Sequence, residues 1–241
     1  SASAVFCATR FRTGSPHSAF LALSFLQRLV DWGRKMIPGV VLAGGASSRM
    51  GGHPKALLPA GPGQETFLRR IISTLLAGGV DDVVVVTGYH DDLIEQAVDR
   101  MGLPVRMLRN PTPELGQLSS LLVALRAVDH PGVNAMLVTL VDLPLLSTAT
   151  VRAVLEGYRR TPAPVVRPVR DGQHGHPVIF DRALFDVLRN ADPQHGAKPV
   201  VRAHAAESVE VRVDDEGAFA DVDTPKDYQR LFGVLPPGFD D

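Results

Sequence analysis

The fold is decided by one stretch of the sequence, VVLAGGASSRMGGHPK, which runs from Val40 to Lys55. A short apolar strand leads directly into a loop with four glycines within nine residues, followed by a lysine. Glycine permits positive φ and a close approach of the backbone to a ligand. Backbone N–H groups in such a loop form an anion-binding concavity, to which Arg49 and Lys55 add positive charge. We therefore predict that the loop binds the phosphates of a nucleotide and is not a mere connector.

The spacing within this loop excludes two common phosphate-binding motifs. A Walker A motif requires Gly-Lys-Ser/Thr, but Gly52 is followed by His-Pro-Lys-Ala. A dinucleotide fingerprint requires Gly-x-Gly-x-x-Gly, whereas Gly44 and Gly45 are adjacent. The remaining pattern, LAGGxxxRMGGxxK, resembles the signature loop of the MobA-like nucleotidyltransferases, which include the molybdenum-cofactor nucleotidyltransferases.

The composition is that of an ordinary globular protein. The chain has 241 residues, of which 45% are hydrophobic and 21% charged, and its formal net charge is −1. This balance gives no sign of a nucleic-acid partner. The single cysteine, Cys7, excludes an intrachain disulfide and a cysteine metal cluster, which fits a reducing cytoplasm. The sequence has no run of 18 apolar residues, so we predict a cytoplasmic protein without a membrane partner.

The first 36 residues differ from the rest of the chain, and we predict that they are an N-terminal extension. Residues 1–30 contain no Asp or Glu, and an apolar stretch at 19–26 follows two arginines. Three interpretations remain open: a segment upstream of a true start at Met36, a targeting segment, or an added helix over about 19–34. The catalytic domain is predicted over 37–233 and a C-terminal tail over 234–241.

Strand and helix patterns alternate from residue 37 onward. Apolar, β-branched runs alternate with helical spacings, and the spacings at 66–77 and 91–101 end at glycine. This order predicts one domain with a doubly wound, mostly parallel sheet, a Rossmann-like three-layer α/β/α fold of the class α/β. In such folds, ligands bind at the carboxyl ends of the strands. We predict strands at 39–43, 82–88, 104–108 and 135–141 and helices at 66–77, 91–101, 118–128 and 148–160, then short strands near 164–167, 176–180 and 209–213 and helices near 182–190 and 225–232.

Two acidic residues are candidate Mg²⁺ ligands. Asp142 follows a buried strand, and Mg²⁺ is typically bound by one or two carboxylates together with phosphate oxygens and water. The alternative role for Asp142 is to cap the turn at Pro144. Asp223 precedes a helix start at Thr224-Pro225, so its alternative role is to shape that helix entry. The family resemblance implies that Asp142 binds the metal and that Asp223 completes the site.

Two further segments resemble the same family. Asn110, Gly116 and Ser119 match a segment that binds nucleotide and shapes the acceptor side, although Ser119 is also a candidate helix N-cap. The stretch 170–180 resembles the Gly-His-Pro-Val segment of the cytidylyltransferase branch. We expect three of its polar residues, Arg170, His174 and His176, to contact an anionic acceptor. The alternative is that the two histidines form a metal-binding pair. Residues 196–198 resemble a later glycine-containing loop of the same branch.

The resemblance implies a Mg²⁺-dependent nucleotidyltransferase that moves NMP from an NTP to a phosphorylated acceptor and releases pyrophosphate. Three segments favour a CTP-using enzyme that acts on molybdopterin, whereas the loop itself resembles that of guanylyltransferases. GTP as donor, a sugar-phosphate acceptor and a non-catalytic nucleotide-binding regulator are the alternatives, and a molybdoenzyme or cofactor-handling protein is an implied partner. The predicted catalytic residues are Arg49, Lys55 and Asp142, and the predicted nucleotide-binding residues are Leu42, Ala43, Gly44, Gly45, Ser48, Arg49, Lys55, Asn110, Gly116 and Ser119.

Overall fold

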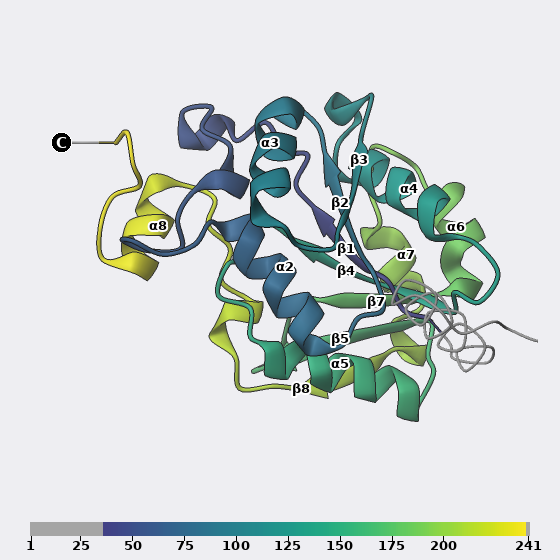
Figure 1. Cartoon of the computed structure of the whole chain (residues 1–241). Coiled ribbons are helices and arrows are strands. Elements are labelled where there is room, and N and C mark those ends of the chain that lie inside the picture. Colours follow the sequence, from purple (N-terminus) through teal and green to yellow (C-terminus); the bar gives the residue numbers. More distant parts are fainter. Residues whose placement is uncertain (1–35, 240–241) are drawn as a thin grey trace, which may run out of the picture. The chain divides into compact units, whose positions relative to one another are not determined.

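The apolar runs of the sequence form the centre of a mixed eight-stranded sheet in the computed structural model, which describes residues 36–239 (Figure 1). The strand order is β3-β2-β1-β4-β7-β5-β6, and β8 pairs with β5. The interpretations of residues 1–35 lie outside the described residues. The strands are β1 Gly39–Leu42, β2 Val83–Thr87, β3 Arg106–Arg109, β4 Ala135–Leu140, β5 Val165–Arg170, β6 Gln173–His174, β7 Val178–Asp181 and β8 Val209–Arg212.

Helices cover both faces of the sheet. The first long helix begins where the hydroxyl of Thr66 accepts a hydrogen bond from the Arg69 amide, and it ends at Gly79 in the left-handed region. Such caps satisfy helix-end groups that have no partner within the helix. The helices are α2 Phe67–Gly78, α3 Asp91–Met101, α4 Gln117–Val128, α5 Thr148–Arg160, α6 Phe185–Arg189, α7 Lys198–Ala203 and α8 Pro225–Phe232.

The alternation of side chains along the strands divides the core into two layers. Val41 and Val85 pack on the side that holds α2, α3 and α5. Val40 and Val84 pack on the opposite side, against α4, α6 and α7. Successive side chains of a strand point to opposite faces, so strands that are apolar at every position are covered on both sides. The prediction of a three-layer fold is confirmed.

The prediction of a mostly parallel sheet is also confirmed. Strands β3, β2, β1 and β4 are parallel, whereas β7 runs antiparallel to both β4 and β5. Helix α7 and the two-residue strand β6 were not among the predicted elements. Both are too short for a periodic pattern to form, and α7 carries a proline in its first turn.

The loop after β1 and helix α8 lie side by side, although they come from opposite ends of the described chain (Figure 1). The hydroxyl of Tyr228 donates to the carbonyl oxygen of Pro59 at 2.9 Å, and Phe67 stacks on the Tyr228 ring. This packing fixes the segment that carries Asp223 next to the glycine-rich loop.

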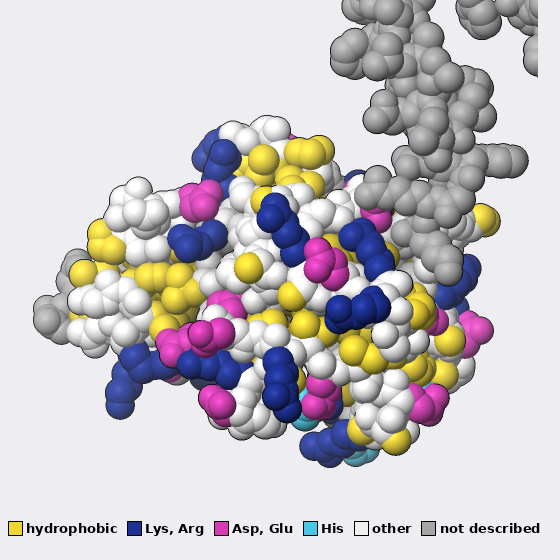
Figure 2. Space-filling view, turned by 90° about the horizontal axis from the view of Figure 1, so that it is seen from below, with side chains coloured by type: hydrophobic (Ala, Val, Ile, Leu, Met, Phe, Trp, Pro, Cys, Tyr) yellow, Lys and Arg dark blue, Asp and Glu magenta, His cyan; other side chains and the backbone are white. Residues whose placement is uncertain are grey.

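The surface seen in Figure 2 carries both signs of charge, with Lys and Arg side chains lying among Asp and Glu. Among the described residues, no helix combines the length and the apolarity that a bilayer crossing requires.

Candidate active site

A cavity of about 300 Å³ opens at the carboxyl edge of the sheet, where the glycine-rich loop leaves β1. Its walls come mainly from this loop, the turn after β2, the start of α4 and the end of β4. The structure thus brings together most of the predicted nucleotide-binding residues. Those that line the cavity are Leu42, Ala43, Gly44, Gly45, Ser48, Arg49, Lys55 and Gly116, together with Asp142.

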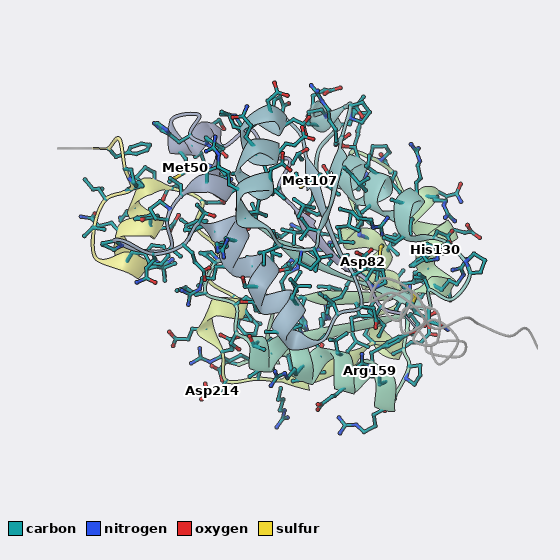
Figure 3. The ribbon with its side chains drawn as sticks, viewed as in Figure 1. Met50, Asp82, Met107, His130, Arg159 and Asp214 are labelled. Carbon is teal, nitrogen blue, oxygen red and sulfur yellow. The ribbon has the colours of Figure 1, made fainter. Side chains whose placement is uncertain are left out.

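Left-handed backbone in the middle of the loop turns the chain back toward the sheet. Ser47, Gly51 and Gly52 have φ values of 51°, 59° and 79°. The Ser47 hydroxyl accepts a hydrogen bond from the Lys55 amide at 3.2 Å. Between them, Met50 is completely buried and anchors the loop in the core (Figure 3). These contacts hold Lys55 in one place.

The first two glycines of the loop serve a different purpose. Neither has positive φ among the described glycines. A Cβ on Gly44 would lie 3.0 Å from the Ser120 hydroxyl, and a Cβ on Gly88 would lie 2.5 Å from the Gly44 carbonyl oxygen. A Cβ on Gly45 would meet no atom within 4 Å. Gly44 and Gly88 therefore permit close packing of two strand ends, while Gly45 leaves open space in front of the loop.

The charged centre of the site is formed by Lys55 and two carboxylates. The Lys55 ammonium lies 2.5 Å from Oδ1 of Asp223 and 3.5 Å from Oδ2 of Asp142. Arg49 reaches the other oxygen of Asp223 at 2.8 Å. The amide of Val222 donates to the Asp142 carbonyl at 2.9 Å, so the two acidic segments are joined through their backbones. Arg49, Lys55, Asp142 and Asp223 thus meet at one point.

The two carboxylates differ in their environment. Burial raises the pKa of Asp142, although the charge of Lys55 opposes this effect. The hydrogen bond from Lys55 lowers the pKa of Asp223, with a further contribution from Arg49. Moreover, Oδ1 of Asp142 is buried and has no hydrogen-bond partner. A buried anionic oxygen without a partner is unfavourable unless a cation approaches it. Asp142 is therefore suited to bind a metal ion.

The alternative roles of these two residues are not seen. Helix α8 is capped by Thr224 and Asp227, which form a reciprocal capping box, so the Asp223 carboxylate is not used for the helix start. Asp142 makes no hydrogen bond to the turn at Pro144 in the described structure. The described residues contain no cluster of three or more His, Cys, Asp or Glu that would hold a metal alone. Two carboxylates plus phosphate oxygens and water are nevertheless what Mg²⁺ typically uses.

Two predicted nucleotide-binding residues lie behind the cavity wall and not in it. Asn110 is 1% exposed, and its amide donates to the hydroxyls of Ser119 and Ser120 at 2.7 and 2.9 Å. The Ser119 hydroxyl in turn donates to the Gly116 carbonyl. Ser119 is also not the N-cap, since α4 begins after Gly116. Both residues are used to close the 110–119 loop on itself.

The three predicted acceptor residues are separated in space. His176 is half-buried, and desolvation of its ring lowers its pKa; it lines a second cavity beside the first. His174 instead pairs with Glu210 at 2.6 Å, and Arg170 pairs with Glu216 and borders a different hollow. The structure therefore does not bring Arg170 and His174 to this second cavity. The alternative of a histidine metal pair is not seen among the described residues.

The cavity wall also includes residues that the sequence analysis did not nominate: Tyr89, His90, Pro113, Gln117 and Ser120. Tyr89 is 51% exposed, and Nε2 of the His90 ring lies 3.4 Å from the carbonyl oxygen of Ala46. A signal was present, because both residues directly follow the β2 run at the carboxyl end of a parallel strand.

Comparison with known proteins identifies the family of this site. The model of the MobA-like NTP transferase domain matches residues 39–209. The chain is 35% identical over 182 residues to a probable molybdenum cofactor guanylyltransferase of Rhodopirellula baltica, covering 68% of this chain and 84% of that protein. It is 34% identical over 203 residues to nicotine blue oxidoreductase of Paenarthrobacter nicotinovorans, covering 81% and 96%.

A solved structure shares the fold. The crystal structure of Rv0371c from Mycobacterium tuberculosis has a TM-score of 0.70 and 30% identity, covering 83% of this chain and 99% of that chain. A second structure of Rv0371c, described as a complex with manganese, has a TM-score of 0.65 and 28% identity, covering 83% and 100%. The glycine-rich loop, Lys55 and Asp142 all lie within the residues that the family model matches.

Proposed function

The chain belongs to the MobA-like NTP transferase family, and we propose that it transfers CMP from CTP to a phosphorylated acceptor such as molybdopterin and releases pyrophosphate. The observation that carries this proposal is the position of Lys55 between Asp142 and Asp223, beside the glycine-rich loop. Phosphoryl-type transfer depends mainly on positioning and on stabilisation of charge, and this arrangement supplies both.

The residues have distinct roles in the proposed reaction. Backbone N–H groups near Gly44 and Gly45 cradle the triphosphate, since Gly45 leaves room for it. Lys55 and Arg49 leave Asp223 and neutralise the phosphates. The terminal phosphate of the acceptor attacks the α-phosphorus in line, the bond to the β-phosphate oxygen breaks, and pyrophosphate departs. This reaction does not require a nucleophile from the protein.

A divalent cation fits the two carboxylates. The partnerless Oδ1 of Asp142 and the side chain of Asp223 are the groups that would hold Mg²⁺, which would reduce the negative charge of the phosphates. The manganese described for Rv0371c supports a divalent-cation site in this family. With a cation held by these two carboxylates, Lys55 would be free to contact phosphate oxygens.

The choice of base is the finer part of the proposal. The segments 116–120, 140–146 and 175–180 resemble the cytidylyltransferase branch, which supports CTP. The Leu-Ala-Gly-Gly start of the loop and the guanylyltransferase name of the Rhodopirellula baltica relative support GTP instead. GTP is therefore the competitor against which CTP has to be measured.

The test is pyrophosphate release by the full chain with Mg²⁺ and each of the four nucleoside triphosphates, in the presence of molybdopterin, of sugar phosphates, or of no acceptor. We expect release that requires molybdopterin and is fastest with CTP. Faster release with GTP would show that GTP, and not CTP, is the nucleotide donor. Release only with sugar phosphates would show that the acceptor is a sugar phosphate and not molybdopterin. Tight nucleotide binding without release for any acceptor would favour the regulatory binding protein.

The name of the Paenarthrobacter nicotinovorans relative calls for a second readout. A reductase takes hydride from a nicotinamide or flavin cofactor, and the loop of this chain lacks the dinucleotide fingerprint. Oxidation of NADH and NADPH is therefore followed in the same samples, with nicotine blue added. We expect no change in the oxidation rate. Stimulated oxidation without pyrophosphate release would overturn the transferase proposal.

A further inference from the structure

A second, larger cavity of about 550 Å³ lies beside the nucleotide cavity, over the face of the sheet that α4 and α7 cover. The two cavities share Leu42, Gly116, Gln117 and Leu140, so a common wall joins them. The volume is in the range of sites that bind small organic molecules. A ligand in the second cavity therefore lies next to a nucleotide in the first.

The floor of the second cavity is apolar. It includes side chains from α4 and from the strands β4 and β7, as well as Val201 of α7. An apolar surface of this kind favours a ligand body that is itself apolar or aromatic, because water is released from both surfaces on contact. The floor residues are Leu118, Leu121, Val138, Val178, Phe180 and Val201.

The walls of the same cavity are cationic. Arg167 of β5 is largely buried, and its Nε has no hydrogen-bond partner, while its Nη2 reaches Glu210 at 3.3 Å. Lys198 and Arg202 come from α7, are exposed, and have no ion pair within residues 36–239. None of the described residues that line this cavity is Asp or Glu. A largely buried guanidinium with an unused donor is suited to an anionic ligand.

We propose that this cavity binds the acceptor and that the acceptor is an amphipathic organic phosphate, with an apolar ring body on the floor and an anionic group held by Arg167, Lys198 and Arg202. This inference rests on the proposed function in one respect, namely that the site takes a phosphorylated acceptor. It adds the location, the chemical class of the body and three binding residues.

Binding of a simple compound of this class tests the inference without turnover. The probe is 1-naphthyl phosphate, titrated into the full chain by calorimetry in parallel with 1-naphthol and inorganic phosphate. We expect saturable binding of 1-naphthyl phosphate that weakens as salt rises, and at least tenfold weaker binding of each fragment. Absence of saturable binding of 1-naphthyl phosphate would overturn the inference, as would equal binding of 1-naphthol.

A pair of double variants with the same charge change locates the site. Lys198→Met with Arg202→Met removes two cations from α7, whereas Arg159→Met with Arg160→Met removes two from α5, on the opposite face of the sheet; Arg159 is labelled in Figure 3. We expect about tenfold weaker probe binding in the first variant only. Arg167→Lys, which keeps the charge but loses the fork of donors, is expected to weaken binding as well.

The outcomes separate this inference from the proposed function. Equal probe binding by the two double variants would place the probe elsewhere and overturn the inference, even if the chain transfers NMP. Probe binding that requires Lys198 and Arg202 in a chain that releases no pyrophosphate would support the cavity and refute the transferase proposal. Unchanged binding of the triphosphate in both double variants shows that the first cavity is intact.

Discussion

Nζ of Lys55 lies 2.5 Å from Oδ1 of Asp223, although 168 positions separate the two residues in the chain. The same ammonium group lies 3.5 Å from Asp142, so it occupies the position between the two acids where a metal ion would reduce their repulsion. Lys55 thus stabilises the two carboxylates, and the proposed function assigns it contacts to the phosphates of a bound nucleotide.

Lys55→Ala is expected to lower turnover by about 10²–10³-fold, because one group that stabilises developing charge is lost. Pyrophosphate release under saturating triphosphate measures this loss. Lys226→Ala is the matched control, since Lys226 is an exposed lysine of α8 outside the cavity. Near-normal turnover of a folded Lys55→Ala protein would remove Lys55 from the mechanism.

Asp142→Asn is expected to lower activity without lowering stability. Burial raises the pKa of this carboxyl, so its neutral replacement removes a desolvated charge and leaves the melting temperature unchanged or higher. Turnover falls by about 10²–10³-fold. We expect Mg²⁺ to raise the melting temperature of the natural protein by binding the folded state, and this shift to disappear in the variant. A shift of equal size in both proteins would place the metal elsewhere.

His176 is expected to make stability depend on pH. Its pKa is lowered by desolvation below the ordinary histidine value of 6.5, so below pH 6.5 the unfolded chain binds a proton that the folded chain does not. Its contribution to stability is therefore complete above pH 6.5 and declines as the pH falls toward the lowered pKa, by at most about 1.4 kcal/mol per pH unit. Denaturant unfolding from pH 8 to pH 5 measures the decline.

His176→Gln removes this titration, so the difference in stability between the natural protein and this variant should shrink as the pH falls. A difference that stays constant from pH 8 to pH 5 would contradict the desolvation argument.

Two glycines of the site are expected to respond differently to alanine. A Cβ on Gly88 would lie 2.5 Å from the Gly44 carbonyl oxygen and 2.9 Å from Pro113, so Gly88→Ala should lower the free energy of unfolding by about 1–3 kcal/mol. A Cβ on Gly45 would meet no protein atom within 4 Å, so Gly45→Ala should be as stable as the natural protein. Its methyl group, however, would enter the nucleotide cavity. We expect it to raise the KM for the triphosphate about tenfold. An unchanged KM would show that phosphates do not approach Gly45.

The last described residues are expected to support the loop. The Phe239 ring meets His53 edge-on with centroids 5.6 Å apart, and its Cζ lies 3.2 Å from where a Cβ of Gly51 would be. Phe239→Ala should raise the KM for the triphosphate about fivefold, on the order of 1 kcal/mol, by loosening the loop. The effect on kcat should be smaller. Val234→Ala, at an exposed position of the same tail, serves as the comparison and should change neither constant.

Much of the fold followed from local patterns. The β-branched run of β2, and the helical spacings of α2 and α3 with their glycine stops, predicted these elements to within a residue or two. Such patterns are local, because burial on one or both faces repeats with the period of the element. The same logic placed Asp142 and the glycine-rich loop at one edge of the sheet.

The positions of His174 and His176 could not be predicted from local sequence patterns. His174 and His176 are two positions apart and would share a face of a regular strand. In the structure β6 ends at His174 and β7 begins at Val178, so the chain turns between them. His174 therefore meets Glu210 of β8, and His176 lies near the Val138 carbonyl of β4.

The sequence by itself determined the alternating strands and helices, the glycine-rich loop and the position of Asp142 at the end of β4, because each depends on neighbours within a few residues. Only the tertiary structure decided that Asp223 meets Lys55, that Asn110 supports the loop from behind, and that Arg167 shares a cavity with Lys198. These pairings depend on how distant elements pack and on the direction in which each side chain leaves its strand, which no local period specifies.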